Sequence, residues 1–227
     1  MAPYTLQSPP RSEDELMLRV RKLAGKTFGQ VAADIGETVP TDQRHAKGWL
    51  GQLVEACLGA TAGSRSVPDF ESIGVELKTL PIDATGVPTE STFVCVTPMG
   101  EKAGTSWEES PVYRKLKRVL WLPVQAHIPM LERRIAAGFL WSPDAQEYAL
   151  LKADWDELMG MVLTGHVDDI SGHQGEVLQI RPKAANASAE TWGIGVDGGK
   201  VRTLPRGFYL RPAFTRAILH KNLMVRG

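Results

Sequence analysis

The order of the expected elements predicts an α/β fold with a mixed central sheet. Three helix-like segments come first, strand-like apolar runs follow, and a long amphipathic helix precedes the last strands. Helices and strands in such an order typically pack as helices against a sheet. The chain has 227 residues, of which 43% are hydrophobic and 23% charged, as in an ordinary globular protein with one sizeable core. We therefore expect a single domain over residues 1–227.

The helices are indicated by capping signals and by apolar residues at helical spacing. Residues 12–15 fit a capping box ahead of a first helix that Gly25 would end. Residues 27–35 predict a second helix, closed by Gly36. A third helix is expected over 47–58. Two later helices complete the set, a long one over 145–163 with an acidic outer face (Asp154, Asp156 and Glu157) and a last one over 213–223.

The strands are indicated by short apolar runs. In the run 75–80, Val75 and Leu77 fall on one face of a strand, and Glu76 and Lys78 fall on the other. The run 92–96 is almost continuously apolar, which is typical of a strand buried on both faces. A polar turn is expected between these two runs, from residue 81 onward. Further strands are expected at 119–122, 139–141, 176–181 and 207–211.

Charge is unevenly distributed along the chain, although its formal net charge is zero. From Ile170 onward, nine basic residues stand against three acidic ones, which gives this part a net charge of +6. The basic residues are Arg181, Lys183, Lys200, Arg202, Arg206, Arg211, Arg216, Lys221 and Arg226, and the acidic ones are Glu176, Glu190 and Asp197. A basic folded surface of this kind is what a phosphate backbone selects.

The cellular setting is indicated by the cysteines and by the apolar runs. Cys57 and Cys95 lie in apolar segments without CxxC spacing, so we expect reduced core residues. No apolar run approaches the length of a membrane span, and the N-terminus lacks the basic and then apolar order of a signal peptide. We therefore expect a cytoplasmic protein that does not associate with a membrane.

The segment 68–79 brings two carboxylates and a lysine close together. Asp69 comes from the turn just before the first strand, and Glu76 and Lys78 share one face of that strand. Two neighbouring carboxylates bind a hard divalent cation such as Mg2+. A lysine beside such an ion orients or deprotonates a water molecule and stabilises charge on a phosphate. These groups are the ones that phosphodiester hydrolysis needs, although a solvent-exposed strand is an equally good interpretation of the motif alone.

Three other features of the sequence each allow a functional and a structural interpretation. Residues 28–36 are similar to the first helix of a helix-turn-helix, which would indicate a DNA-binding regulator without catalysis. The next segment, 37–46, is polar and contains Pro40, so two packing helices are favoured instead. Glu55 either approaches the metal from the third helix or is a solvated carboxylate. The basic run 113–118 either contacts phosphate or forms a solvated helix face.

Several sequence blocks are far more specific than the catalytic motif. They are Lys47-Gly48-Trp49, Ala62-Gly63-Ser64, Asp69-Phe70, Gly74-Val75-Glu76-Leu77-Lys78-Thr79, Thr92-Phe93-Val94-Cys95-Val96, Lys115-Leu116-Lys117-Arg118-Val119-Leu120-Trp121, Gln179-Ile180-Arg181-Pro182-Lys183-Ala184-Ala185-Asn186-Ala187 and Thr203-Leu204-Pro205-Arg206-Gly207-Phe208-Tyr209-Leu210. In these blocks the chain resembles the MutH family of methyl-directed mismatch-repair endonucleases, within the PD-(D/E)xK nuclease superfamily. Departures from the family pattern lie mainly in the first dozen residues, in 100–105 and in 188–200.

The resemblance implies a fold, an activity and partners. The fold is a restriction-endonuclease-like mixed sheet flanked by helices, with an N-terminal catalytic lobe and a C-terminal DNA-reading lobe that form a DNA-binding cleft. The activity is Mg2+-dependent nicking of the unmethylated strand at hemimethylated GATC, 5′ of the G. Double-stranded DNA with hemimethylated or unmethylated GATC is the implied substrate, MutL the activator and MutS an indirect partner. The protein is expected to act as a monomer.

The resemblance also implies a role for individual residues. Asp69 and Glu76 hold the metal with the backbone carbonyl of Leu77, and Lys78 acts on the attacking water. The active-site surroundings are completed by Glu55 and Lys115. Residues implied to read the site and sense the adenine methyl group are Arg181, Pro182, Lys183 and Tyr209. Two further residues fall on DNA-contacting segments of the family, namely Lys47 and Phe93.

Two other functions remain as alternatives. A GATC-specific restriction endonuclease is closely related, but double-strand cleavage needs a second active site and this chain has one Asp-Glu-Lys set. A non-catalytic helix-turn-helix protein is the alternative from a different class. The appearance of nicked DNA in Mg2+, and its absence in chelator, separates an enzyme from a binder.

Overall fold

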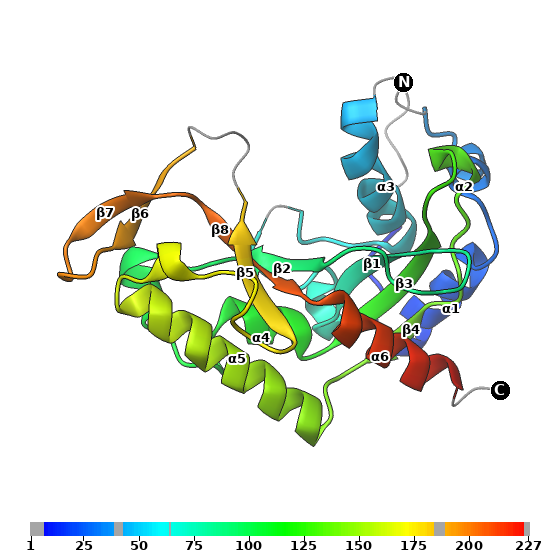
Figure 1. Ribbon diagram of the computed structural model, residues 1–227. Coiled ribbons are helices and arrows are strands. Elements are labelled where there is room, and N and C mark those ends of the chain that lie inside the picture. The colour runs from blue at the N-terminus through cyan, green and yellow to red at the C-terminus, as the bar shows by residue number, and fades with distance from the viewer. Residues whose placement is uncertain (1–6, 39–42, 64, 184–188, 225–227) are drawn as a thin grey trace. The chain divides into compact units, whose positions relative to one another are not determined.

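The computed structural model describes residues 7–38, 43–63, 65–183 and 189–224 (Figure 1). The chain divides into two compact units. Unit 1 comprises residues 1–89 and 118–141, and unit 2 comprises residues 90–117 and 142–227. None of the helices in the described ranges has the length and apolar character needed to span a membrane.

Unit 1 packs helices against a small mixed sheet. Its elements are α1 (Glu13–Leu23), α2 (Phe28–Ile35), α3 (Gln43–Leu58), η1 (Glu71–Ile73), β1 (Glu76–Ile82), β3 (Val119–Gln125), η3 (Met130–Glu132) and β4 (Phe139–Trp141). The sheet order is β1-β3-β4, with β1 parallel and β4 antiparallel to β3. Leu120 and Leu122 of the central strand share one buried cluster with Val20 of α1, Phe28 of α2 and Val54 of α3. The core of unit 1 therefore lies between the helices and β3.

Unit 2 is built around an antiparallel sheet. Its elements are β2 (Thr92–Val96), η2 (Gly100–Ala103), α4 (Pro111–Leu116), α5 (Ala145–Leu163), η4 (Val167–Asp169), β5 (Leu178–Pro182), β6 (Thr191–Ile194), β7 (Lys200–Thr203), β8 (Arg206–Leu210) and α6 (Pro212–Met224). The sheet order is β2-β8-β5, and β6 and β7 pair separately as a two-stranded hairpin. The long helix α5 runs alongside β5 (Figure 1).

The predicted α/β class is confirmed, but the strands of the described chain are divided among three small sheets instead of one central sheet. The helix starts follow from local chemistry, since the side chains of Ser12, Thr27 and Asp144 accept hydrogen bonds from backbone N–H groups of the first turns of α1, α2 and α5. Residues 36–42 separate α2 from α3. The two helices of a helix-turn-helix motif are joined by a turn of only about three to four residues. The longer connection here argues against a helix-turn-helix and thus against the DNA-binding regulator.

Several predicted boundaries were wrong for identifiable reasons. The first strand continues through Pro81, which was expected to begin a turn. Glu76 N–H points toward the neighbouring strand and donates to Arg118 O at 3.0 Å, so alternation turns Pro81 to the other edge of β1, where its carbonyl accepts from Thr89 N–H at 3.0 Å. A proline is tolerated there because its nitrogen lies outside the β1–β3 ladder. The third helix begins at Gln43, earlier than the predicted 47. The strand β2 was expected to be buried on both faces, but Phe93 is only half-buried and Val96 is exposed.

Asp154 was predicted on the acidic outer face of α5, and this was wrong. Asp154 lies three residues after Leu151 and four before Leu158, so it shares their buried helix face and is only 6% exposed. Its carboxylate accepts hydrogen bonds from the N–H groups of Glu176, Val177 and Leu178, at 2.8, 2.6 and 2.7 Å. A buried carboxylate is tolerated here because it satisfies the backbone at the start of β5.

Candidate active site

Asp69 is positioned by a tight turn immediately before β1. Phe70 and Val75 exchange backbone hydrogen bonds of 2.9 and 3.3 Å, and η1 fills the loop between them. Gly74 closes this loop with φ of 67°, in the left-handed region that glycine adopts without steric cost. The turn therefore returns the chain so that the segment before Phe70 lies beside the start of β1.

The Asp69 carboxylate lies at the open edge of β1. Leu77 N–H donates to Asp69 Oδ2 at 2.9 Å. In a strand the N–H and C=O groups of one residue point to the same edge. The carbonyl oxygen of Leu77 is therefore directed to the edge where Asp69 lies, as the metal-binding role implied for it requires.

Glu76 and Lys78 form a buried ion pair on one face of β1. Lys78 Nζ lies 2.7 Å from Glu76 Oε1, and the two side chains are 11% and 3% exposed. The predicted alternation of β1 is thus confirmed, since Val75 and Leu77 are buried on the other face. A solvent-exposed strand face was the alternative for this motif, and the burial of Glu76 and Lys78 contradicts it.

The start of β1 with the Asp69 carboxylate beside it, called the corner below, offers oxygen atoms that fit a hard cation such as Mg2+. Asp69, Glu76 and the Leu77 carbonyl offer only oxygen atoms, which Mg2+ prefers, and leave coordination positions for water. Among the residues that the structure describes, no three His, Cys, Asp or Glu side chains gather as a set of metal ligands. Two carboxylates and one backbone carbonyl are the ligands that the family resemblance implies for this place, and their role as metal ligands stays a prediction.

The C-terminal end of α3 is tied to the Asp69 segment. The carbonyl of Glu55 accepts hydrogen bonds from Gly59 and Ala60 N–H at 2.9 Å, and Thr61 N–H donates to Asp69 O at 2.9 Å. Glu55 is half-buried, and its Oε1 lies over Gly51, one turn earlier on the helix. The backbone thus brings the helix that carries Glu55 to the same corner.

Two of the other expected residues are placed only in part. Lys115 is half-buried on α4, which belongs to unit 2, so its role stays a prediction. Lys47 lies within α3, but its side chain is outside the described residues. The basic run around Lys115 also has a structural member, because Arg118 binds the Glu13 carboxylate at the start of α1 through two nitrogens.

One face of the unit 2 sheet, called the reading face below, carries most of the residues with implied DNA contacts. Phe93 pairs with Tyr209, Tyr209 pairs with Gln179, and Gly207 pairs with Arg181. Residues directly opposite in an antiparallel sheet, and those two apart along a strand, share a face. Phe93, Tyr209 and Arg181 therefore point the same way, although β2, β5 and β8 are far apart in the sequence.

Ring contacts hold the charged side chains on this face. The Phe93 and Tyr209 rings meet edge to face with centroids 5.3 Å apart. Lys183 Nζ lies 3.2 Å from the Phe93 ring centroid, and Arg181 Cζ lies 5.8 Å from that of Tyr209. A Cβ added at Gly207 would come within 2.8 Å of the Phe93 ring and 3.4 Å of Lys183 Cδ. Glycine at this position therefore leaves the space that these side chains occupy.

Pro182 does not share this face. It pairs with Arg206 and alternates with Arg181 along β5, so its ring points to the opposite side of the strand. The resemblance implies that Pro182 and Tyr209 help to sense the adenine methyl group. The strand register, however, does not let the two side chains form one wall against that group. Tyr209 remains the residue of this pair on the reading face.

Two polar residues of the reading face were missed from the sequence. Gln179 is buried, and its Nε2 donates to Ser91 Oγ at 2.9 Å. Ser91 Oγ also accepts a longer hydrogen bond of 3.4 Å from Arg181 Nη1. No spacing rule connects residues 88 and 90 positions apart, and the signal that relates them is the strand pairing itself.

Some of the basic residues after Ile170 form ion pairs and hydrogen bonds within unit 2. Arg206 is buried and binds Asp168 Oδ1 at 2.6 Å, and Arg211 donates to the carbonyls of Gly172, Gln174 and Gly175. The net charge of the segment therefore overstates the number of cations that face solvent. Arg181 and Lys183 are exposed.

The cysteines show no catalytic arrangement. Cys57 is half-buried and Cys95 is buried, and these two residues are not joined by a disulfide bond. Burial raises the pKa of the Cys57 thiol to about 11, so it is protonated and weakly nucleophilic at neutral pH. Cys95 is therefore a core residue, as expected, and Cys57 is partly buried against the core of unit 1.

Comparison with known proteins identifies the family. Residues 58–154, which include Asp69, Glu76, Lys78 and Lys115, match the model of the family described as DNA mismatch repair enzyme MutH. The chain is 49% identical over 223 residues to the DNA mismatch repair protein MutH of Enterobacter sp. (strain 638), with 97% of each chain covered. It is 48% identical over 226 residues to the proteins of that name from Escherichia coli O9:H4 (strain HS) and Escherichia coli (strain K12), with 99% of each chain covered. This similarity extends over both units, and we conclude that the chain belongs to the MutH family of DNA mismatch repair proteins.

Proposed function

We propose that this protein is a Mg2+-dependent endonuclease that nicks the unmethylated strand of duplex DNA at hemimethylated GATC sites, 5′ of the G, during mismatch repair. Membership of the MutH family supports the reaction class and the DNA substrate. The observation that carries the proposal is the corner of β1, where the buried Glu76–Lys78 pair adjoins the Asp69 carboxylate bound to Leu77 N–H. Such a combination of carboxylates and lysine is suited to hydrolysis of a phosphodiester bond.

Each residue of the corner has a separate task in this reaction. Asp69, Glu76 and the Leu77 carbonyl would hold Mg2+, which when bound supplies Lewis-acid activation of water and stabilises charge on the phosphate. Lys78 is kept in place by Glu76 and orients the attacking water, and its ammonium group offsets the negative charge that develops on the phosphate oxygens. Glu55 and Lys115 are proposed to line the surroundings of this corner.

Recognition of the site is assigned to unit 2. Arg181 is long enough for a bidentate hydrogen bond to guanine O6 and N7 in the major groove. Lys183 contacts phosphate, as a compact point charge suits. An N6-methyl group on adenine projects into the major groove, and the rigid Tyr209 ring, packed against Phe93, leaves no space for it. Phe93, Pro182 and Lys47 complete the proposed DNA contacts.

The number of active sites favours nicking by a monomer. The chain carries one Asp-Glu-Lys set, so one monomer cuts one strand. Unit 1 makes the cut and unit 2 reads the site. MutL activates the protein, MutS acts on it indirectly, and the reaction takes place in the cytoplasm.

The test is incubation of circular DNA with the protein, with the GATC sites unmethylated, hemimethylated or fully methylated. We expect nicked circles from the first two forms in Mg2+, cuts only in the unmethylated strand of the second, and intact circles in chelator. Linear product from unmethylated DNA without nicked intermediates would favour the restriction endonuclease. GATC binding without any cut in Mg2+ would overturn the proposed reaction and favour a non-catalytic binder.

A further inference from the structure

The β6–β7 hairpin lies outside all the residues to which a role has been given above. Most of it falls in the segment 188–200, where the sequence departs from the family pattern. The hairpin was not expected from the sequence, although Asp197-Gly198 is a turn signal between two short strands. Its two faces differ in character.

The inner face of the hairpin is fixed to the rest of unit 2. Thr203 Oγ1 donates to Asp168 Oδ1 at 3.1 Å, and the same carboxylate oxygen binds Arg206 at 2.6 Å. Within the hairpin, a Cβ added at Gly193 would lie 2.9 Å from the Thr203 methyl group, so its two strands are closely packed. At the end of α5, a Cβ at Gly165 would lie 2.3 Å from the backbone of Gly195. This close approach and the Asp168 hydrogen bond hold the hairpin against the rest of unit 2.

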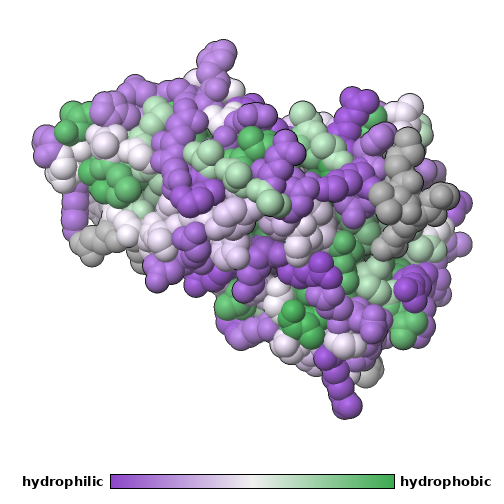
Figure 2. Space-filling model, turned by 90° about the horizontal axis from the view of Figure 1, so that it is seen from below, coloured by the Kyte–Doolittle hydropathy of each residue, from purple (hydrophilic) through white to green (hydrophobic). Residues whose placement is uncertain are grey.

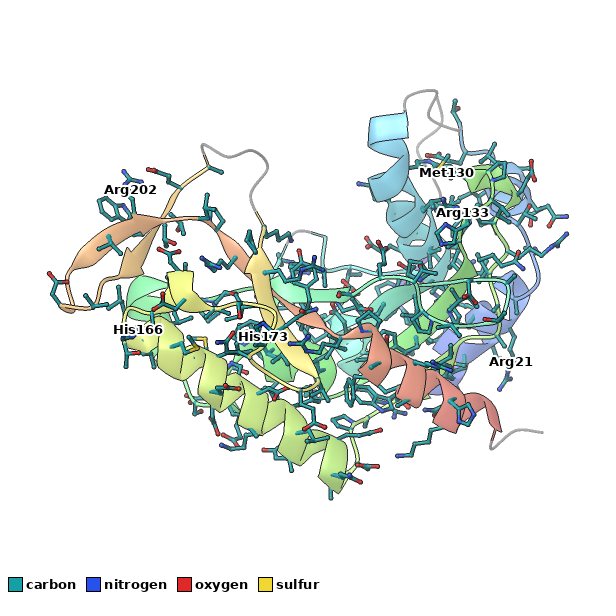
Figure 3. All side chains as sticks on the ribbon, viewed as in Figure 1. Arg21, Met130, Arg133, His166, His173 and Arg202 are labelled. Carbon is teal, nitrogen blue, oxygen red and sulfur yellow. The ribbon has the colours of Figure 1, made fainter. Side chains whose placement is uncertain are left out.

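The outer face carries a tryptophan stacked with an arginine. Trp192 pairs with Arg202 across the hairpin, and Ile194 pairs with Lys200, so these four side chains share a face. The Arg202 guanidinium carbon lies 4.0 Å from the Trp192 ring centroid. Trp192 is 52% exposed and the Arg202 side chain 53%. In Figure 3, Arg202 projects from β7 on the side away from α5.

This arrangement suits an anionic ligand. Stacking on the ring pre-orients the guanidinium while its N–H edge stays accessible, so that little side-chain entropy is lost on binding. The nearest carboxylate, Glu190 Oε2, is 3.9 Å from Arg202 Nε, and both side chains are more than half exposed, so this ion pair is weak. The acidic groups nearby are held elsewhere, because Asp168 binds the inner face and Asp197 Oδ1 accepts from Gly199 N–H within the turn.

The distance to the reading face favours DNA as this ligand. Arg206 pairs with Pro182 on β5, and Arg202 precedes it by four residues. Four residues span at most about 14 Å, even fully extended. This length corresponds to about four base pairs at the ~3.4 Å rise of duplex DNA. A duplex read by Arg181 therefore has its flank within reach of the hairpin.

We propose that the outer face of the hairpin binds the phosphate backbone of the duplex beside the recognised tetranucleotide. Arg202 donates to a phosphate, Lys200 adds positive charge, and Trp192 is a positioning residue that holds the guanidinium. Since only phosphate is contacted, this binding is independent of sequence. The inference rests on the proposed function, because it takes the duplex held by Arg181 as its starting point.

Duplex length provides the test. Binding is measured in chelator with duplexes that carry a central hemimethylated GATC and flanks of about 3, 6 or 12 base pairs, spacings set by the ~3.4 Å rise. The wild type should bind the two longer duplexes more tightly than the shortest. Arg202→Gln should remove this gain, with about a tenfold loss on long duplexes, as expected for one charged hydrogen bond. The slope of log affinity against log salt should fall by about 0.9, the value for one lost phosphate contact.

Matched variants make the test specific. Trp192→Ala should weaken long-duplex binding as Arg202→Gln does, whereas Trp192→Phe, which keeps a ring under the guanidinium, should retain most of it. Lys152→Gln removes an exposed cation from α5 in the same unit and should change nothing. The proposal is overturned if Arg202→Gln binds duplexes of every length as tightly as the wild type does. This holds even if the variant is less activated by an added partner protein, because the outer face would then serve a protein contact and not DNA. An equal loss on the shortest duplex also overturns it, by placing Arg202 in the tetranucleotide site.

The same series on duplexes without GATC separates this inference from the proposed function. A sequence-independent contact predicts that Arg202→Gln still weakens long-duplex binding there. If the wild type neither nicks nor prefers GATC but this loss persists, the proposed function fails and the hairpin contact stands. If the wild type nicks GATC and the loss is absent from both series, the hairpin inference fails alone.

Discussion

The proposed catalytic corner of unit 1 and the proposed reading face of unit 2 hold their side chains in opposite ways. Glu76 and Lys78 are buried and bonded to each other, and Asp69 is fixed by a backbone N–H group. On the reading face, Arg181 and Lys183 are exposed and rest against the Tyr209 and Phe93 rings. Groups that perform one reaction gain from a rigid, desolvated setting. Groups that contact DNA must remain accessible to it, and stacking orients them without burying them.

The surface drawn in Figure 2 is mixed in its hydropathy. In the view of Figure 2, hydrophobic residues are scattered among hydrophilic ones. Large exposed apolar patches usually mark protein or membrane contacts. The face drawn there offers no single large patch of this kind, so polar and charged groups are the features to test.

The largest expected effect is loss of the catalytic corner. Asp69→Ala, Glu76→Ala and Lys78→Ala should each reduce nicking by roughly 10²–10³-fold or more, since removed catalytic groups of this type cost that much. Nicking rates on hemimethylated DNA, with melting curves for each variant, measure this effect. Near-normal activity in any one of the three would show that the corner is not the active site.

Glu76 and Lys78 variants need a stability control because the pair is buried. Removing one partner leaves the other charge without its hydrogen bond in a desolvated place. Asp69→Asn is the gentler change, since the remaining amide oxygen still accepts from Leu77 N–H. It should melt like the wild type and yet be inactive, which would assign the loss to chemistry and not to unfolding.

The two exposed cations of the reading face should differ from each other. Arg181→Ala should lose preference for GATC over scrambled DNA, with about 1–3 kcal/mol of discrimination lost for one bidentate base contact. Lys183→Ala should weaken binding to all sequences alike and reduce the steep salt dependence, with a slope smaller by about 0.9. Binding titrations on both sequences at several salt concentrations decide this. Identical behaviour of the two variants would contradict the separation of base and phosphate contacts.

Methyl discrimination should depend on Tyr209. Packing an added methyl group against a rigid ring costs about 1–3 kcal/mol, or roughly tenfold or more in occupancy. Tyr209→Ser should therefore keep part of its activity on unmethylated GATC and lose much of its ability to spare the methylated strand. The ratio of cutting rates on the two strands measures this. An unchanged ratio with a lowered melting temperature would instead make Tyr209 a purely structural residue, since it is half-buried against Phe93.

The smallest expected effect is on stability, through the Glu13–Arg118 ion pair of unit 1. Hydrogen bonds from Arg118 hold the pKa of Glu13 below its ordinary value. A carboxyl group with a lowered pKa in the folded state stabilises the fold above its unfolded pKa and loses this contribution as pH falls through the folded pKa. Glu13→Gln should thus lower the free energy of unfolding near neutral pH by less than about 1 kcal/mol, because the pair is partly exposed. The wild type and the variant should converge in acid, and methyl discrimination should not change.

The catalytic corner could be predicted from the sequence because its parts are local. Asp69, Glu76 and Lys78 lie within ten residues, and strand alternation alone puts the last two on one face. The capping signal at residues 12–15 likewise predicted the start of α1, where the Ser12 side chain accepts from Glu15 N–H.

The reading face and the internal ties could not be predicted in this way. Tyr209 meets Phe93 through strand pairing across more than a hundred positions, and the register decided that Pro182 points away from them. Asp154 looked like a solvated acidic residue because its partners are backbone N–H groups at the start of β5, which leave no pattern in side-chain chemistry. The resemblance to a family supplied the residues of this face, and the structure showed which of them lie together.

If unit 1 cuts and unit 2 reads, the two properties should separate in a single variant. The most direct measurement is binding of Asp69→Asn, in chelator, to hemimethylated and to fully methylated GATC duplexes, compared with the wild type under the same conditions. The inactive variant should keep the wild-type ratio of the two affinities, because Tyr209 and Arg181 are untouched. A ratio that collapses together with nicking, in a variant that melts like the wild type, would contradict this separation of cutting from reading.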